Sequence, residues 1–185
     1  IIGDTNMDRV EKVLLTKKQI FAGIEKLAEK LNKKFKGKNP LMIGIVNGVV
    51  PFYGVLSINL TFDHEYDFIK CESYLGTKQS QVVKVLWQKR RSVKGKDIIL
   101  LDDIFDTGHT ILATVKLLKA EGARSVTTVT LLDKASAHPK NRKPDYSCFK
   151  IPNVWVVGFG LDTAGMMRNL PCIGVLRKDL QEKYK

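Results

Sequence analysis

Two β-branched apolar segments on either side of a helical segment restrict the fold of this chain more than any other feature. Residues 97–101 and 125–132 are rich in Ile, Val, Thr and Leu, and residues 107–121 between them form a helical segment that Gly122 can cap. A strand, a helix and a second strand in this order are typical of a parallel sheet with helices on both faces. We therefore expect an α/β fold with a central, mostly parallel sheet, and ligands at the carboxyl ends of its strands.

The first half of the chain follows the same pattern. A helix is predicted from the capping-box sequence Thr16–Gln19 up to Gly37, with apolar residues at helical spacing. Residues 41–46 are expected to form a buried strand, and residues 51–57 a short helix with Pro51 in its first turn. These elements would extend the same parallel sheet.

The remaining segments give shorter strands. Residues 64–71 and 81–87 are predicted strands, and the polar stretch 73–80 between them is predicted to be a mobile loop, too long for a tight hairpin. Three short strands are expected in the tail and should form a small subdomain over the edge of the sheet: 146–149, 154–159 and 172–176.

Length and composition indicate a single globular domain, and the cysteines indicate the cytoplasm. The chain has 185 residues, 44% hydrophobic and 27% charged. Residues 39–62 carry no charge and are long enough to span a bilayer, but Asn47, Gly48 and Pro51 favour a buried strand, a turn and a helix instead. The three cysteines (Cys71, Cys148 and Cys172) lack the spacing of a zinc site or a disulfide framework, so we expect reduced thiols.

The net charge of +12 leaves two kinds of ligand open. An enzyme that binds several phosphates would use such a charge, and so would a nucleic-acid-binding protein. Lys89-Arg90-Arg91, followed by Lys94 and Lys96, is the best candidate for a basic patch. No aromatic residues alternate with these lysines and arginines, so nucleic-acid binding is the second reading.

The segment Leu101-Asp102-Asp103-Ile104-Phe105-Asp106-Thr107-Gly108-His109-Thr110 carries the strongest chemical signal. A helix N-terminus offers unpaired N–H groups, and Gly108 lets the backbone approach a ligand closely, which is how proteins cradle phosphate. Asp102 and Asp103, at the end of a strand, can hold sugar hydroxyls or hydrated Mg²⁺. Asp106 could instead cap the helix. The string also matches the DDxxD pattern of isoprenoid synthases, but those enzymes place it within a helix.

Residues 101–110 resemble the signature loop of phosphoribosyltransferases, which bind 5-phosphoribosyl 1-diphosphate. Further stretches resemble the hypoxanthine–guanine branch, in the right order over roughly residues 10–176: Ser73-Tyr74, Leu131-Leu132-Asp133-Lys134, Ile151-Pro152-Asn153, Val156-Val157-Gly158 and Leu161-Asp162. The resemblance implies the type I phosphoribosyltransferase fold, with a core at about 38–140 and a hood from about 1–15 and 145–185. It also implies a homodimer or homotetramer that acts in purine salvage.

The resemblance assigns roles to individual residues. Thr107, Gly108, His109 and Thr110 would hold the 5′-phosphate. Asp102 and Asp103 would hold the ribose hydroxyls and Mg²⁺, and Asp162 a second Mg²⁺ through water. Asn47, Gly48 and Arg168 would bind the diphosphate. Asp106, which would also lie against the phosphoribosyl group, would act as the general base at N7 of the purine. The N7 proton must leave as N9 bonds to the ribose.

The purine itself would meet a third group of residues. Lys134 would donate to the 6-oxo group, Trp155 would stack on the ring, and Val156 and Asp162 would line the base edge. Ser73 and Tyr74 would lie on a lid that excludes water. On the residues alone, Lys134 could be a surface charge and Trp155 a core residue.

Several positions depart from the family pattern. Asn47 stands where the family commonly has lysine, His109 where lysine is frequent, and Thr163 where an aromatic residue is usual. These departures bear on diphosphate affinity and on the fit around the base. The alternative function is a nucleotide-sensing, nucleic-acid-binding regulator on the same fold.

Overall fold

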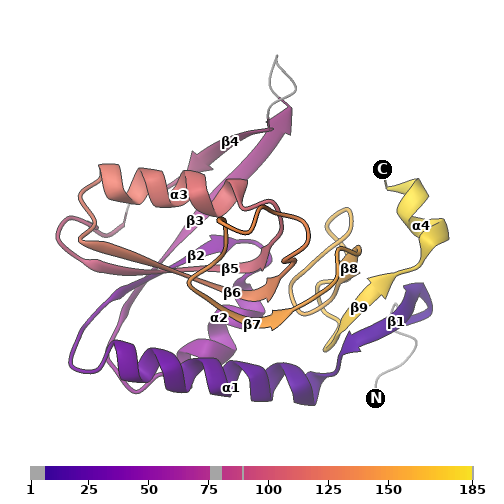
Figure 1. The fold of residues 1–185 in the computed structure, drawn as a ribbon, viewed down its shortest axis with the longest axis horizontal. Coiled ribbons are helices and arrows are strands. Elements are labelled where there is room, and N and C mark those ends of the chain that lie inside the picture. The colour runs from indigo at the N-terminus through magenta and orange to yellow at the C-terminus, as the bar shows by residue number, and fades with distance from the viewer. Residues whose placement is uncertain (1–6, 76–80, 89, 185) are drawn as a thin grey trace.

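A six-stranded main sheet, with helices on both faces, makes up most of the molecule (Figure 1). The structure is a computed structural model that describes residues 7–75, 81–88 and 90–184, without the side chains of residues 73–75, 81 and 82. Its elements are η1 (Met7–Arg9), β1 (Val10–Leu15), α1 (Lys17–Lys34), β2 (Leu41–Val46), α2 (Val50–Ser57), β3 (Glu65–Leu75), β4 (Gln81–Leu86), β5 (Asp97–Phe105), α3 (His109–Ala120), β6 (Ser125–Asp133), β7 (Tyr146–Lys150), β8 (Val156–Val157), β9 (Ile173–Leu176) and α4 (Lys178–Lys183).

The strand order of the main sheet is β4-β3-β2-β5-β6-β7. All neighbouring strands are parallel except β4, which pairs antiparallel with β3 at one edge. One face carries α1 and α2, and the other carries α3 (Figure 1). The α/β prediction is confirmed, because strands buried on both faces need helices on both sides.

Helix α1 begins as its sequence predicts. The Thr16 hydroxyl accepts a hydrogen bond from the Gln19 N–H at 3.3 Å, and the Gln19 side chain accepts one from the Thr16 N–H at 2.9 Å. This capping box satisfies N–H groups that the first turn leaves without partners. The buried stripe of the helix, which packs on the main sheet, is Ile20, Ile24, Leu27, Ala28 and Leu31.

The second sheet has the order β1-β9-β8 and brings the two ends of the chain together (Figure 1). Strand β9 pairs antiparallel with both β1 and β8. Strand β8 is shorter than the predicted 154–159, because Gly158 (φ 98°) and Phe159 (φ 47°) turn the backbone out of the extended conformation. We call this sheet, together with α4, the hood.

The expectation that 146–149 joins the small subdomain is wrong, because β7 pairs in parallel with β6 in the main sheet. The cause is packing against α1, since Phe149 fills the space beside Gly23. A Cβ at Gly23 would lie 2.2 Å from the Phe149 ring. The glycine lets the ring dock on the helix, and that contact fixes the strand at the sheet edge.

The predicted loop 73–80 is also partly wrong. Strand β3 continues to Leu75 and pairs antiparallel with β4, with Ser73 opposite Val83 and Tyr74 opposite Val82. The rest of that loop, residues 76–80, lies outside the described residues. Within the described ranges, no helix is long and apolar enough to cross a membrane.

Candidate active site

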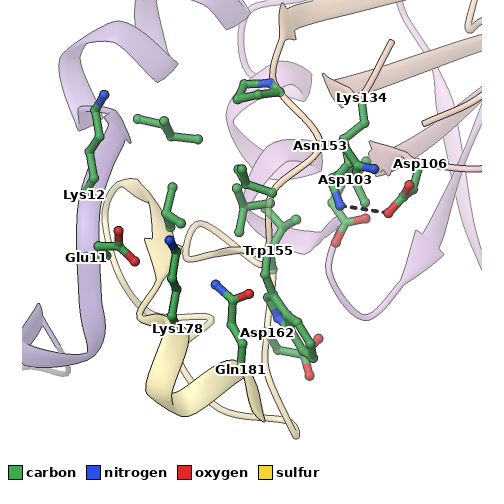
Figure 2. Close-up of a pocket in the computed structure, with 17 residues that line it drawn as sticks. Glu11, Lys12, Asp103, Asp106, Lys134, Asn153, Trp155, Asp162, Lys178 and Gln181 are labelled. Atoms are coloured by element: carbon green, nitrogen blue, oxygen red, sulfur yellow. Dashed lines mark hydrogen bonds and ion pairs between the residues drawn. The ribbon is translucent and has the colours of Figure 1, made fainter. Parts of the chain in front are cut away.

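Two cavities meet at the carboxyl ends of β5 and β6. The larger, of about 810 Å³, opens between the main sheet and the hood (Figure 2). The smaller, of about 290 Å³, lies over the turn from β5 to α3. Both are lined by Asp103, Ile104 and Asp106, so the two cavities share a wall.

The smaller cavity lies at the N-terminus of α3 and is lined by the loop residues Thr107, Gly108, His109 and Thr110. Strand β5 runs on to Phe105, and α3 begins at His109, with Gly108 as its N-cap at φ 80°. No side chain caps the helix there, so the reading of Asp106 as a helix cap is wrong. The first-turn N–H groups of a helix are available to an anion.

Asp102, which is buried, and Asp103, which is half-buried, form a pair of carboxyl groups beside this cavity. The Asp103 N–H donates to the Asp102 side chain at 3.0 Å. Burial, and next the charge of Asp103, raise the pKa of Asp102 well above its usual range. Burial likewise raises the pKa of Asp103. A cation bound between them would relieve both effects.

These carboxyl groups fit magnesium. Mg²⁺ prefers oxygen ligands and is usually held by one or two carboxylates, waters and substrate phosphates. Among the described residues there is no cluster of three or more His, Cys, Asp or Glu side chains that would enclose a metal ion. The protein thus offers the partial set of ligands that suits Mg²⁺ bound together with a phosphorylated substrate.

The turn from β2 to α2 packs directly on Asp103. A Cβ at Gly48 would lie 1.6 Å from the Asp103 Oδ2 atom, and a Cβ at Gly160 would lie 2.0 Å from the Gly48 carbonyl oxygen. Arg168 donates to the Gly160 carbonyl at 2.6 Å and pairs with Asp162 at 2.8 Å. The fold therefore gathers Gly48, Asp103, Asp162 and Arg168, which the sequence separates. Asn47 is exposed beside them, and its peptide bond with Val46 is cis.

The larger cavity contains a buried lysine. The Lys134 Nζ donates to the Asp106 Oδ2 at 2.8 Å (Figure 2), and the Lys134 side chain is 11% exposed against 46% for Asp106. Lys134 is therefore no surface charge. Its backbone N–H donates to the Phe105 carbonyl at 2.9 Å, which fixes the end of β6 beside the end of β5.

The hood supplies the opposite wall of this cavity. Trp155 is half-buried, packs against the hood cluster that includes Val157 and Met167, and also lines the cavity. Its stacking on a purine stays a prediction. Val156 is buried in β8, and Asp162 lines the cavity. Sequence reasoning missed the hood residues that face Lys134 across the space (Figure 2): Glu11, Lys12, Lys178 and Gln181.

The predicted lid residues are placed only by their backbone. Ser73 and Tyr74 lie near the end of β3, and their side chains are outside the described part of the chain. Neither residue is among those lining the described walls of the two cavities.

The chain is similar to known phosphoribosyltransferases. The model of the phosphoribosyl transferase domain matches residues 12–164. The hypoxanthine-guanine phosphoribosyltransferase of Lactococcus lactis is 44% identical over 97% of this chain and 99% of its own, and that of Streptococcus pyogenes is 39% identical over 94% and 97%.

Solved structures agree with this relationship. A hypoxanthine phosphoribosyltransferase from Staphylococcus aureus superposes with a TM-score of 0.91 at 31% identity, over 97% of this chain and 98% of its own. A hypoxanthine phosphoribosyltransferase from Trypanosoma cruzi superposes with a TM-score of 0.87 at 30% identity, over 94% of this chain and 99% of its own. This chain belongs to the phosphoribosyltransferase family, in the branch of the hypoxanthine-guanine phosphoribosyltransferases, and has the type I fold of that family.

Proposed function

We propose that this enzyme transfers the 5-phosphoribosyl group of 5-phosphoribosyl 1-diphosphate to N9 of hypoxanthine or guanine, giving IMP or GMP and diphosphate. The observation that carries the proposal is the wall shared by the two cavities. A phosphate cradle lies on one side of Asp103 and Asp106, and a buried lysine with a tryptophan lies on the other. A sugar phosphate and a base would meet at this wall.

The smaller cavity would hold the phosphoribosyl group. Thr107 and Thr110 would bind the 5′-phosphate together with the backbone of Gly108 and His109, at the positive end of α3. Asp102 and Asp103 would hold the ribose hydroxyls and Mg²⁺. When bound, Mg²⁺ would neutralise the diphosphate as it leaves.

The diphosphate would lie over the β2–α2 turn. Gly48 brings backbone against Asp103, and the amide groups at Asn47 and Gly48 suit an anion that has Mg²⁺ beside it. Arg168 supplies the positive charge, held in place by Asp162 and by the Gly160 carbonyl. Asp162 would add a water-mediated contact to a second Mg²⁺.

The larger cavity would hold the purine. The 6-oxo group and N7 lie side by side on one edge of a 6-oxopurine. Lys134 and Asp106 also lie side by side, 2.8 Å apart. The base would insert this edge between them, so that Lys134 donates to the oxo group and Asp106 accepts the N7 proton. Trp155 would stack on the ring, and the Val156 backbone would meet its far edge.

Water must be kept from the oxocarbenium-like transition state. We assign this role to a lid that includes Ser73 and Tyr74. The β3–β4 arm, which extends beyond the body of the main sheet, supports the assignment (Figure 1). Closure of such a lid would accompany binding of both substrates.

A panel of purines tests the proposed function. With 5-phosphoribosyl 1-diphosphate and Mg²⁺, we expect nucleotide formation from hypoxanthine and guanine, followed spectroscopically. Adenine should be a poor substrate, because Lys134 would face an amino donor. No magnesium-dependent nucleotide formation from any oxopurine would overturn the proposal.

Replacing Lys134 by methionine should raise KM for hypoxanthine roughly 10- to 100-fold, since a hydrogen bond from a charged group is lost. KM for 5-phosphoribosyl 1-diphosphate should change much less. The fold should survive, because Asp106 is half-exposed and water can solvate it once its partner is gone. An unchanged KM for hypoxanthine would remove Lys134 from the base site.

The alternative of a nucleic-acid-binding regulator has no support. The similar proteins are named as enzymes. In the basic cluster, Arg91 pairs with Glu65 at 3.2 Å, and Lys96 pairs with the same carboxylate. Part of the positive charge that suggested nucleic acid is therefore neutralised locally.

We also propose a homodimer or homotetramer in the cytoplasm. An exposed apolar surface runs from α2 to β3, where Ile58, Tyr66 and Val50 are 82%, 66% and 53% exposed. Tyr53 and Phe68 connect its two ends through ring contacts. A second copy of the chain would cover this surface. Light scattering of the purified protein would measure the mass of the assembly.

The proposed location in the cytoplasm agrees with the three cysteines, which carry free thiols, as in reducing compartments.

A further inference from the structure

A buried histidine lies behind the phosphate loop, and the proposed mechanism does not use it. The His138 Nε2 atom is 2.8 Å from the Asp133 Oδ1 atom, and the two side chains are 3% and 5% exposed. Buried ionisable pairs of this kind are costly to form and are disrupted severely when one partner is removed. Their presence beside a functional loop therefore needs a reason.

Both nitrogens of the His138 ring face acceptors. Nε2 faces the Asp133 carboxylate, and Nδ1 faces the Pro139 carbonyl at 3.3 Å. A neutral imidazole has a single N–H group, so this environment suits the doubly protonated cation. Burial lowers the pKa of His138, but the hydrogen bond that its ring donates to Asp133, the Pro139 and Arg142 carbonyls and the Asp133 charge outweigh burial and raise the pKa above its ordinary value.

The ring also supports the turn that begins α3. It packs edge-on against Phe105, with centroids 4.8 Å apart and planes at 79°. Phe105 in turn fills the space under Gly108, where an added Cβ would lie 2.5 Å from the Phe105 ring. Contacts thus run without a gap from Asp133 through His138 and Phe105 to Gly108.

The same histidine ends the turn that follows Lys134. The Ala137 N–H donates to the Lys134 carbonyl at 2.7 Å, and the Lys134 N–H donates to the Phe105 carbonyl at 2.9 Å. The ammonium group of Lys134 forms an ion pair with the Asp106 carboxylate. Asp133 is the charged side chain that contacts the His138 ring. The protonation of His138 is therefore coupled to the geometry at the ends of β5 and β6.

We propose that His138 is a positioning residue for the 5′-phosphate loop: its buried pair with Asp133 holds Phe105, and Phe105 holds Gly108 at the start of α3. The inference rests on the proposed function, because it takes Thr107–Thr110 as the phosphate site. Loss of the pair loosens the cradle and weakens binding of 5-phosphoribosyl 1-diphosphate, whereas the chemical step is affected less.

Steady-state kinetics of three variants test this role. His138→Leu should raise KM for 5-phosphoribosyl 1-diphosphate roughly 3- to 30-fold, with a smaller change in kcat. His138→Gln keeps an N–H donor for Asp133 without the charge, so it should show the same change at a smaller size. The matched control is His64→Leu, which removes a half-buried histidine that is hydrogen-bonded to Ser57 at 2.9 Å and lies away from both cavities. Its KM values should equal those of the wild type.

The pH profile separates positioning from simple packing. A histidine with a raised pKa keeps its pair fully below its ordinary pKa of about 6.5 and loses it as the pH rises through the raised value. KM of the wild type for 5-phosphoribosyl 1-diphosphate should therefore rise as the pH increases above the ordinary histidine value, beyond the range in which the ligand's own phosphate titrates. In His138→Gln this rise should be absent.

The remaining outcomes distinguish a positioning role of His138 from a merely structural one. If His138→Leu and His138→Gln lower only the unfolding temperature and leave KM and its pH profile unchanged, His138 is merely structural and the inference fails. Thr110→Val serves as the benchmark for the loop. If it raises KM but the His138 variants do not, the inference alone fails. If Thr110→Val leaves KM unchanged, the proposed phosphate site fails as well.

Discussion

Replacing Asp106 by asparagine is expected to lower kcat about 10²- to 10⁴-fold, the usual contribution of a general base. Asparagine has the same shape, and its side-chain oxygen can still accept the hydrogen bond that Lys134 now gives to Asp106 at 2.8 Å. It cannot take the N7 proton of the purine. KM for hypoxanthine should therefore change much less than kcat.

Single-turnover measurement of IMP formation checks this expectation, because it separates the chemical step from product release. The matched control is Asp145→Asn, which alters a carboxylate that accepts hydrogen bonds from Thr128 at 2.7 and 2.9 Å, outside both cavities. It should lower stability and leave the rate of the chemical step intact. A chemical rate within threefold of the wild type in Asp106→Asn would show that another group accepts the proton.

Replacing Gly48 by alanine is expected to lower kcat/KM about 100-fold or more, since displacing a catalytic group by an ångström is known to have an effect of this size. The added Cβ would lie 1.6 Å from the Asp103 Oδ2 atom, so the carboxylate must move. The backbone of Gly48 does not lie in the left-handed region, so a glycine is needed here for the close approach to Asp103 and not for its φ angle. The loss should be greatest at low Mg²⁺, where Asp103 matters most.

Titration of activity with Mg²⁺ measures this effect. The control is Gly54→Ala in α2, where an added Cβ meets nothing within 4 Å and alanine favours the helix. It should keep wild-type activity and gain slightly in stability. If Gly48→Ala has the Mg²⁺ dependence of the wild type, then Asp103 does not hold the metal ion.

The sequence predicts the centre of this fold well, because its signals there are local. Strand β2 has the predicted limits, since an apolar run between Pro40 and Asn47 leaves no alternative. The capping box at Thr16 sets the start of α1. The loop from Asp102 to Thr110, which lines the smaller cavity, could likewise be located from the sequence, because it consists of adjacent residues that join a strand to a helix.

Features that depend on distant residues could not be read in this way. Strand β7 joins the main sheet through the contact of Phe149 with Gly23, 126 positions away. Lys178 and Gln181 reach the cavity only because β1 and β9 pair, which no local pattern predicts. Phe105 and His138 can support Gly108 only because β5 and β6 pair in a register that places Phe105 opposite Asp133.

A single ligand, a 6-oxopurine nucleotide, should occupy both cavities at once. The chain has two tryptophans, so a Trp87→Phe background leaves Trp155 as the single reporter at the base site. Quenching of its fluorescence would report binding of IMP and of hypoxanthine, and ribose 5-phosphate would be measured by competition with IMP. This is the most direct measurement of the site.

We predict that IMP binds more tightly than either fragment and that both fragments displace it. Thr110→Val should weaken IMP and ribose 5-phosphate but not hypoxanthine, and Lys134→Met should weaken IMP and hypoxanthine but not ribose 5-phosphate. If ribose 5-phosphate fails to displace IMP, or IMP binds no more tightly than hypoxanthine, the two cavities are separate sites and the account is contradicted.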